Sequence, residues 1–90
     1  MKSFFDLYSS FDDFFESFFK GNEFEFVYKQ RRYYILPSYV EGRVKGIILG
    51  ISNEDKETLF LSKESLYLAP IEESFLGNIL KEIEIVWHNI

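Results

Sequence analysis

Apolar and polar positions alternate with a helical period along residues 4–20. When each residue advances about 100° around a helix axis, one face collects apolar side chains and the opposite face collects acids and hydroxyls. Phe5 is an apolar residue on the polar side. The pattern predicts a Phe-rich amphipathic helix that packs against a sheet. The apolar face comprises Phe4, Leu7, Tyr8, Phe11, Phe14, Phe15, Phe18 and Phe19.

The ends of this helical segment carry recognisable capping residues. Ser10 is followed three residues later by Asp13, which is the spacing of a capping box. Ser3 and Asp6 repeat that spacing upstream. The segment is therefore either one helix or two short helices that break just before Ser10. Gly21 is the expected stop, because glycine adopts the left-handed conformation without steric penalty.

The next segment, EFEFVYK, changes to a period of two residues, which indicates a β-strand. A two-residue turn at Lys29-Gln30 would pair Phe26 with Tyr33. The same turn would pair Phe24 with Ile35, so that apolar residues face each other across a hairpin. The usual Asn-Gly turn sequence is missing, which leaves a longer turn open.

Further strands are expected in the middle of the chain. Pro37 predicts that the second strand ends there or lies at a sheet edge. Glu41-Gly42 marks the next turn, and residues 44–51 form a strand that is apolar on both sides and thus central. Gly46 and Gly50 share one face of that strand. We expect the Phe-rich helix to approach the sheet at these glycines.

The C-terminal third mixes short elements. Residues 58–61 predict a short fourth strand, and Ser62 caps a short helix that stops before Pro70. Ser74 is predicted to open a second helix of apolar residues at helical spacing. Residues 84–88, EIVWH, fit either a last strand or a continuation of that helix.

These elements predict one α+β domain over residues 1–90. Its N-terminal amphipathic helix packs on an antiparallel sheet of three or four strands, followed by one or two short helices. The 90 residues are 47% hydrophobic and 28% charged, as in globular domains. The chain lacks cysteine, and no apolar run approaches the roughly 18 residues of a membrane span. We therefore expect a cytoplasmic protein without a signal peptide, away from the membrane.

Parts of the chain resemble small proteins of Gram-positive bacteria and their phages. The resemblance is carried by FDDFFESFFKGNEFEFVYKQRRYYI, SKESLYLAPI and SFLGNILKEIE. It covers the ends of the chain better than the middle, and Lys29-Gln30 stands where those proteins have Asn-Gly in the hairpin turn. The resemblance implies a small α+β fold and a mobile-element setting, and it implies no chemistry.

Catalytic and metal-binding patterns are absent from the sequence. His88 has no Ser or Cys nucleophile at a recognisable spacing. The acid pairs Asp12-Asp13, Glu54-Asp55 and Glu72-Glu73 lack the alternating ligands and glycine of a calcium loop. The glycines form no phosphate-binding loop. We expect no enzyme activity, no cofactor and no metal.

Charge is distributed unevenly along the chain. The net charge is −5, yet residues 29–45 carry +4, so the rest carries −9. Arginines beside tyrosines can contact phosphates and stack on bases, which makes this segment a candidate nucleic-acid site. The candidate residues are Lys29, Arg31, Arg32, Tyr34, Arg43 and Lys45, with Tyr28, Tyr33 and Tyr39 nearby.

The favoured interpretation is a small non-catalytic protein-interaction module from a phage or mobile element. An acidic surface can imitate phosphates, so the expected partner is a host protein such as a defence nuclease. The alternative function is that of a nucleic-acid-binding accessory protein that uses residues 29–45. A third possibility is a structural homo-oligomer, which would account for the many aromatic residues. The candidate partner-binding residues are Phe5, Asp12, Asp13 and Glu16.

Overall fold

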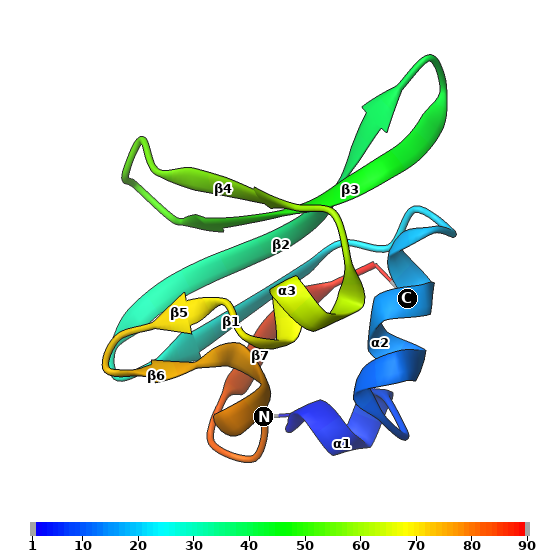
Figure 1. Ribbon diagram of the computed structural model, residues 1–90. Helices are drawn as coiled ribbons and strands as arrows, with labels where there is room; N and C mark the ends of the chain where they lie inside the picture. Colours follow the sequence, from blue (N-terminus) through cyan, green and yellow to red (C-terminus); the bar gives the residue numbers. More distant parts are fainter. Residues whose placement is uncertain (1, 90) are drawn as a thin grey trace.

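The computed structural model describes residues 2–89 and shows helices packed on a five-stranded antiparallel sheet, with a separate two-stranded sheet formed by β5 and β6 (Figure 1). The five strands lie in the order β4-β3-β2-β1-β7. The predicted α+β class is therefore confirmed, and the sheet has five strands instead of three or four. The elements are α1 (Phe4–Leu7), α2 (Phe11–Phe18), β1 (Phe24–Tyr28), β2 (Arg31–Val40), β3 (Arg43–Ile51), β4 (Glu57–Phe60), α3 (Lys63–Tyr67), β5 (Pro70–Ile71), β6 (Ser74–Phe75), a 3₁₀ helix η1 (Leu76–Asn78) and β7 (Glu84–His88).

The N-terminal segment forms two short helices, one of the two predicted alternatives. Tyr8 ends α1 in an extended conformation. The Asp6 carboxylate accepts a hydrogen bond from the Ser3 N–H at 2.9 Å, and the Ser10 hydroxyl accepts one from the Asp13 N–H at 3.1 Å. Each helix thus has its own capping interaction. No helix among residues 2–89 is long and apolar enough to cross a bilayer.

The first hairpin has the predicted register. Phe26 pairs with Tyr33, and Phe24 pairs with Ile35. The two turn residues Lys29-Gln30 have φ values of 49° and 66°. Positive φ at both central positions matches the right-handed twist of the strands, so a two-residue turn forms without Asn-Gly.

The prediction that β2 ends at Pro37 is wrong, whereas the alternative, a position at a sheet edge, holds locally. Pro37 lies inside β2, where it pairs with Ile47 of β3. A proline is tolerated there because β1 pairs with β2 only over residues 31–35. Beyond Ile35, β2 pairs with β3 alone. The backbone N–H that Pro37 lacks therefore leaves no hydrogen bond unmade to a strand on the β1 side.

The expected approach of the Phe-rich helix to Gly46 and Gly50 is also wrong. A Cβ built on Gly50 would lie 2.2 Å from Tyr34 Cζ, and one on Gly46 would lie 2.7 Å from Leu59 Cδ1. The neighbours that approach these glycines are therefore side chains of the adjacent strands β2 and β4.

The C-terminal third departs most from prediction. Ser62 caps α3 as expected, but Ser74 begins β6 and no helix of the predicted length follows it. Glu72 has a φ of 54° in the tight turn between β5 and β6. Gly77 lies against Tyr67, so the chain is held in one short 3₁₀ turn there. Residues 84–88 form the strand alternative, and β7 pairs with β1.

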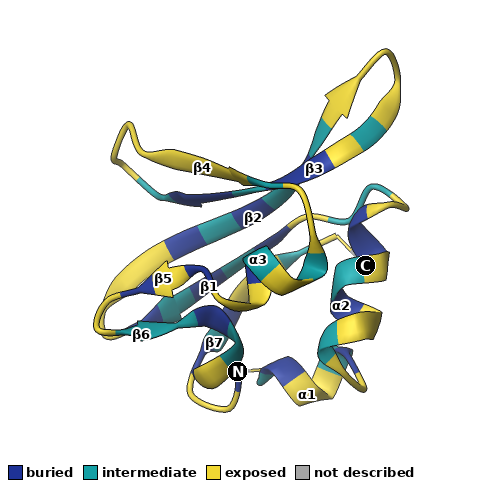
Figure 2. Cartoon of the chain, in the orientation of Figure 1, coloured by how far each residue is buried: buried dark blue, intermediate teal, exposed yellow. Residues whose placement is uncertain are grey.

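The core lies between the helices and one face of the sheet. The ring centroids of Phe14 and Phe24 are 5.1 Å apart, which joins α2 to β1. Phe14 and Phe18 are fully buried as predicted, whereas Phe11 and Phe15 are partly buried against the core. Figure 2 shows buried positions alternating with more exposed ones along β2.

Two assignments on the helical stripe differ from the prediction. Phe19 is 48% exposed although it belongs to the apolar stripe, and Ser17 is buried although it belongs to the polar side. Phe19 is the C-cap residue of α2, where the chain already turns away from the sheet. The Ser17 hydroxyl donates to the Phe14 carbonyl at 2.6 Å, which satisfies it inside the core.

Candidate binding face of the sheet

The sheet has one face covered by helices and one open face. Along β1 the side chains alternate between buried and half-buried, and the buried ones meet the helices. The other set points away from α1, α2 and α3. We define the open face by the side chains of Glu25, Val27, Arg32, Tyr34, Leu36, Ile48, Gly50, Glu57, Leu59, Glu84 and Trp87.

One row of this face crosses all five strands. Trp87 pairs with Glu25, and Glu25 pairs with Tyr34. Tyr34 in turn pairs with Gly50, and Gly50 with Glu57. We call these five residues the transverse row. Since neighbouring strands are about 4.8 Å apart, Trp87 and Tyr34 stand roughly 10 Å apart with Glu25 between them.

Tyr34 is fixed within this row by a hydrogen bond and by a glycine. Its hydroxyl donates to Glu57 Oε2 at 2.5 Å, reaching across β3. The ring can take this path because Gly50 has no side chain. The hydrogen bond to the carboxylate raises the pKa of Tyr34 to about 12. The Tyr34 hydroxyl therefore keeps its proton to a higher pH than an ordinary tyrosine does.

A shallow hollow of about 370 Å³ lies along the row. A second hollow on the other flank of Tyr34 is lined by Glu54, Asp55 and Glu57. Arg32 Nε lies 3.1 Å from Glu25 Oε1, and beside the second hollow Arg31 Nε lies 4.0 Å from Glu54 Oε2. The acids around the two hollows outnumber these two cations, so the open face has a negative surplus. The first hollow is lined by Glu23, Phe24, Glu25, Tyr34, Ile35, Leu36, Glu57 and Trp87.

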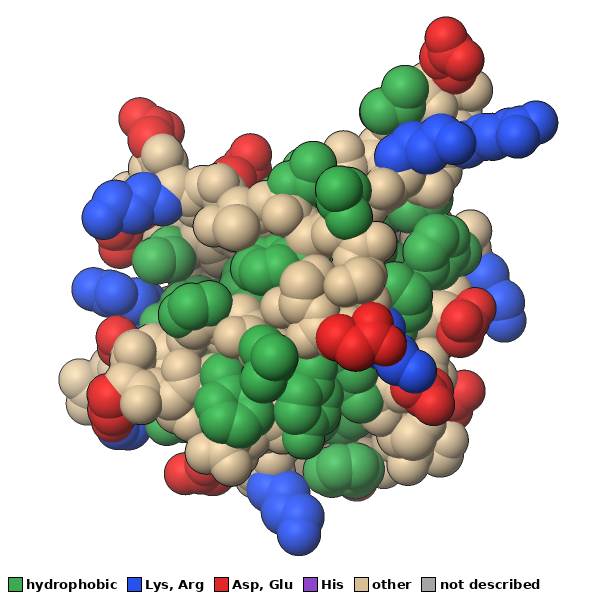
Figure 3. Space-filling model, viewed as in Figure 1, with side chains coloured by type: hydrophobic (Ala, Val, Ile, Leu, Met, Phe, Trp, Pro, Cys, Tyr) green, Lys and Arg blue, Asp and Glu red, His purple; other side chains and the backbone are tan. Residues whose placement is uncertain are grey.

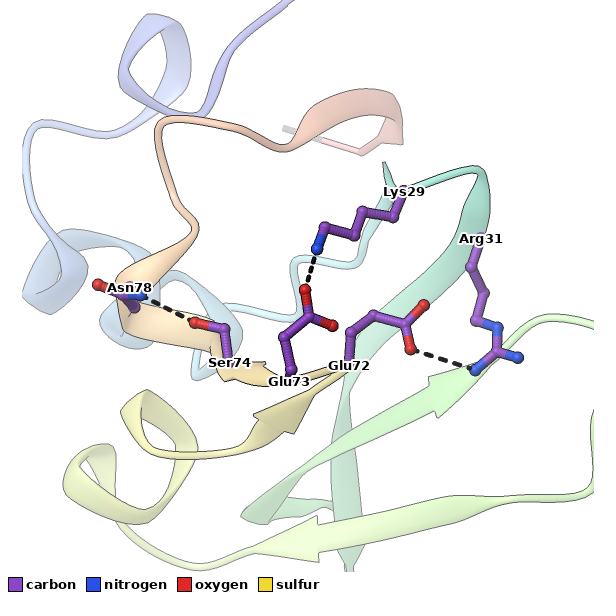
Figure 4. A network of polar contacts seen from close by, with 6 residues as sticks. All are labelled: Lys29, Arg31, Glu72, Glu73, Ser74 and Asn78. Carbon is purple, nitrogen blue, oxygen red and sulfur yellow. Dashed lines mark hydrogen bonds and ion pairs between the residues drawn. The ribbon is translucent and has the colours of Figure 1, made fainter.

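The predicted nucleic-acid residues are split between the two ends of β2. Lys29 forms an ion pair with Glu73, and Arg31 lies 3.7 Å from a Glu72 oxygen (Figure 4). The pair with Lys29 lowers the pKa of Glu73, as a neighbouring cation does for a carboxyl group. A ten-residue strand is on the order of 30 Å long. The cations at the start of β2 are thus far from those at its end.

The other end of β2 leads into a hairpin tip. Arg43 and Lys45 are exposed on β3 there, and the tip projects beyond the rest of the sheet (Figure 1). Tyr39 is 56% exposed near this tip, whereas Tyr28 and Tyr33 are buried core residues. The structure does not assemble the predicted basic, tyrosine-rich cluster on one surface.

The predicted partner-binding residues are partly occupied by contacts within the chain. Asp12 Oδ1 lies 2.8 Å from Lys63 Nζ and links α2 to α3. Asp13 accepts a hydrogen bond from the Ser9 hydroxyl at 2.5 Å, which lowers the pKa of its carboxyl group. Phe5 is 49% exposed on α1, and Glu16 is exposed on α2.

A second apolar surface lies over α3. Tyr67 is 38% exposed and Leu68 is 60% exposed, and the Tyr67 ring meets Phe11 at 5.1 Å between centroids. Figure 3 shows apolar side chains gathered at the centre of this side of the molecule. We call Phe11, Tyr67 and Leu68 the α3 patch.

Residues 2–89 contain no group of three or more His, Cys, Asp or Glu side chains arranged to hold a metal ion. The acid pair Glu54-Asp55 flanks Tyr34, and the pair Glu72-Glu73 faces the cations at the β1–β2 turn. His88 lies on β7, where it pairs with Phe24.

The comparisons with known proteins found no matching family model, no matching curated protein and no matching solved structure. The resemblance to proteins of Gram-positive bacteria and their phages therefore stays a prediction. Sequence reasoning missed Trp87, Glu25 and Glu57 as site residues. The alternation in EFEF was a usable signal for Glu25, because it placed that residue on the solvent side of its strand. Alternation in EIVWH puts Trp87 on the face of the buried Ile85, so it gave no signal for Trp87.

Proposed function

We propose that this chain is a non-catalytic protein-interaction module that binds a partner protein on the open face of its sheet. The observation that supports this is the chemistry of that face. Antiparallel sheets with one solvated face usually carry polar residues there. Here Leu36 pairs with Ile48, and Ile48 pairs with Leu59, so three adjacent strands present apolar side chains.

This apolar row borders the transverse row. Leu59 is 53% exposed, Trp87 is 42% exposed, and Leu61 just beyond β4 is 74% exposed. Contiguous exposed apolar area beside aromatic residues is typical of protein-binding surfaces. The two rows together form a surface with an apolar half and an acidic, aromatic half.

The partner that fits this face has a basic surface with an apolar rim. The acids of the open face would attract such a partner and repel a nucleic acid, whose phosphates carry the same sign. The DNA groove of a nuclease is one basic surface of this kind. Inhibition of a host defence nuclease and origin in a phage or mobile element remain predictions.

Two matched variants test the proposal. Leu59→Asp places a charge on the open face, and Leu68→Asp places the same charge on the α3 patch at similar exposure. Immobilised wild type and both variants are incubated with a Gram-positive lysate, and the retained proteins are quantified. We expect a basic protein that wild type and Leu68→Asp retain and Leu59→Asp loses.

The opposite pattern overturns the proposal. Loss with Leu68→Asp alone would move the interface to the α3 patch. Equal retention by all three proteins, or no retained protein, would remove the open face as an interface. Light scattering on the pure protein adds a further outcome, because self-association that Leu59→Asp abolishes would make a second copy the occupant of this face.

A further inference from the structure

We infer that the transverse row is a receptor for basic side chains of an extended partner segment, with one cation held between Trp87 and Tyr34 above Glu25. This inference rests on the proposed function and names the chemistry of the partner. The shared register of the row across five strands carries it.

The position of Trp87 suits a cation. Trp87 lies one strand from Glu25, so a group centred over β1 lies about 5 Å from the Trp87 column. The Tyr34 ring leans across Gly50 toward Glu57 and closes the far side of the hollow. A cation is attracted to an aromatic ring within about 6 Å of its centroid, and tryptophan gives the strongest attraction. Arginine can also stack its planar group on such rings.

The charges around this position match an incoming cation. Glu25 lies between the two aromatic residues, and Glu23 lines the same hollow. Arg32 makes a contact with Glu25 through one nitrogen, at 3.1 Å, which leaves the second carboxylate oxygen outside that contact. A second guanidinium or ammonium group can therefore add to this carboxylate.

Tyr34 forms a wall that is already ordered. Its hydroxyl is held by Glu57, and its ring lies over Gly50. Binding then requires little additional side-chain ordering on this side of the hollow, and pre-organisation of this kind favours affinity.

The second hollow sets the spacing of a second cation. Glu54, Asp55 and Glu57 lie on the other flank of Tyr34. Strand β4, which carries Glu57, is three strands from β1, or about 14 Å. Four residues of an extended peptide cover about the same length. The row therefore selects a segment with basic residues at positions i and i+4 that crosses the strands.

The experiment uses short fluorescent peptides with threonine spacers. One peptide carries arginines at i and i+4, a second carries them at i and i+2, and a third replaces both arginines with the neutral isostere citrulline. Binding is measured by peptide anisotropy and by the fluorescence of Trp87, which is the one tryptophan of the chain. We expect the i, i+4 arginine peptide to bind tightest and the citrulline peptide to bind on the order of tenfold more weakly or worse.

Variants locate the site. Glu57→Gln and Trp87→Ala should each weaken the arginine peptide on the order of tenfold. Glu64→Gln removes the same charge from an exposed position on α3, on the helix side of the sheet, and should leave the affinity unchanged. Thermal melts of the variants establish that they remain folded. The use of both an acid and an aromatic variant keeps the test valid if either one destabilises β7 or β4.

Three results would overturn the inference: equal binding of the arginine and citrulline peptides, equal weakening by Glu64→Gln and Glu57→Gln, or no binding at all. Such a failure is distinct from failure of the proposed function. If Leu59→Asp still abolishes retention of the partner while the peptides do not bind, the open face remains the interface and the transverse row loses its role.

Discussion

The two faces of the sheet differ in their aromatic residues. The covered face holds Phe24 and Phe26, which are at most 1% exposed, together with the buried Tyr28 and Tyr33. The Phe24 ring meets Phe14 of α2, and the Phe26 ring stacks on Tyr33 of β2. The open face holds Tyr34 and Trp87, whose rings each carry one polar group. A phenylalanine has no group that can form a hydrogen bond with water. Tyrosine and tryptophan combine an apolar ring with one hydrogen-bonding group, which suits a surface that contacts both apolar groups and water. The phenylalanines lie on the covered face, which stabilises the fold, and the open face is the one on which we propose that a partner binds.

The largest expected effect lies on the covered face. Phe14 is 0% exposed and its ring meets those of Phe4, Tyr8, Phe18 and Phe24. Phe14→Ala should lower the free energy of unfolding by about 3–5 kcal/mol, because it leaves a cavity among these rings. Urea denaturation measures this. Phe19→Ala, at an exposed ring, is the control, and equal effects of the two variants would contradict the comparison.

A smaller effect is expected where the open face is tightly packed. Gly50→Ala places a methyl group 2.2 Å from Tyr34 Cζ and should cost about 1–3 kcal/mol through overpacking. In a Tyr34→Ala background the same change should cost much less, because the clashing ring is gone. A double-mutant cycle measured by denaturation provides the check, and additive effects would show that the ring does not lie over Gly50.

The hydrogen bond between Tyr34 and Glu57 should appear in a titration. The pKa of Tyr34 is raised from 10.0 to about 12, so its contribution to stability is present below pH 10 and is lost as the pH rises through 12. Glu57→Gln removes the carboxylate and should bring the pKa of Tyr34 back down. Ultraviolet titration of the tyrosines measures this, with Tyr34→Phe to assign the signal. An unchanged titration in Glu57→Gln would show that another group raises the pKa.

The smallest effect on stability should come from Leu59→Asp. Leu59 is 53% exposed on the edge strand β4, and substitutions at such positions usually change stability by about 0.5 kcal/mol or less. The melting temperature should therefore stay close to that of wild type. A large destabilisation would place Leu59 with the covered face and would remove the contrast between the two faces.

The local sequence pattern correctly predicted the elements whose structure depends on residues close to them in the sequence. The pairing of Phe26 with Tyr33 follows from alternation and a short turn. The caps at Ser10 and Ser62 follow from spacing alone. The predicted helix after Ser74 failed because contacts from elsewhere in the chain decide that segment, where the Tyr67 ring lies against Gly77. Helical spacing of apolar residues cannot report such a contact.

The proposed binding surface depends on pairings between distant segments. The acids of helix α2 stood out in the sequence, yet Asp12 and Asp13 interact within the chain. Trp87 lies beside Glu25 because β7 pairs with β1 and because the register shifts between Glu25 and Phe26. Neither the partner of the last strand nor an irregularity of register can be derived from periodicity.

The position of β7 has a consequence for the order of folding. Strands β1 to β4 are joined by short connections and can pair locally, whereas β7 reaches β1 only after a long loop, residues 29–83, has closed. We expect β7 to dock late and its amides to exchange with solvent sooner than those of β2, which hydrogen-exchange measurements can determine. Trp87 arrives with β7, so a chain that has formed only its early hairpins has an incomplete row. The ability to bind would then appear only with the last step of folding.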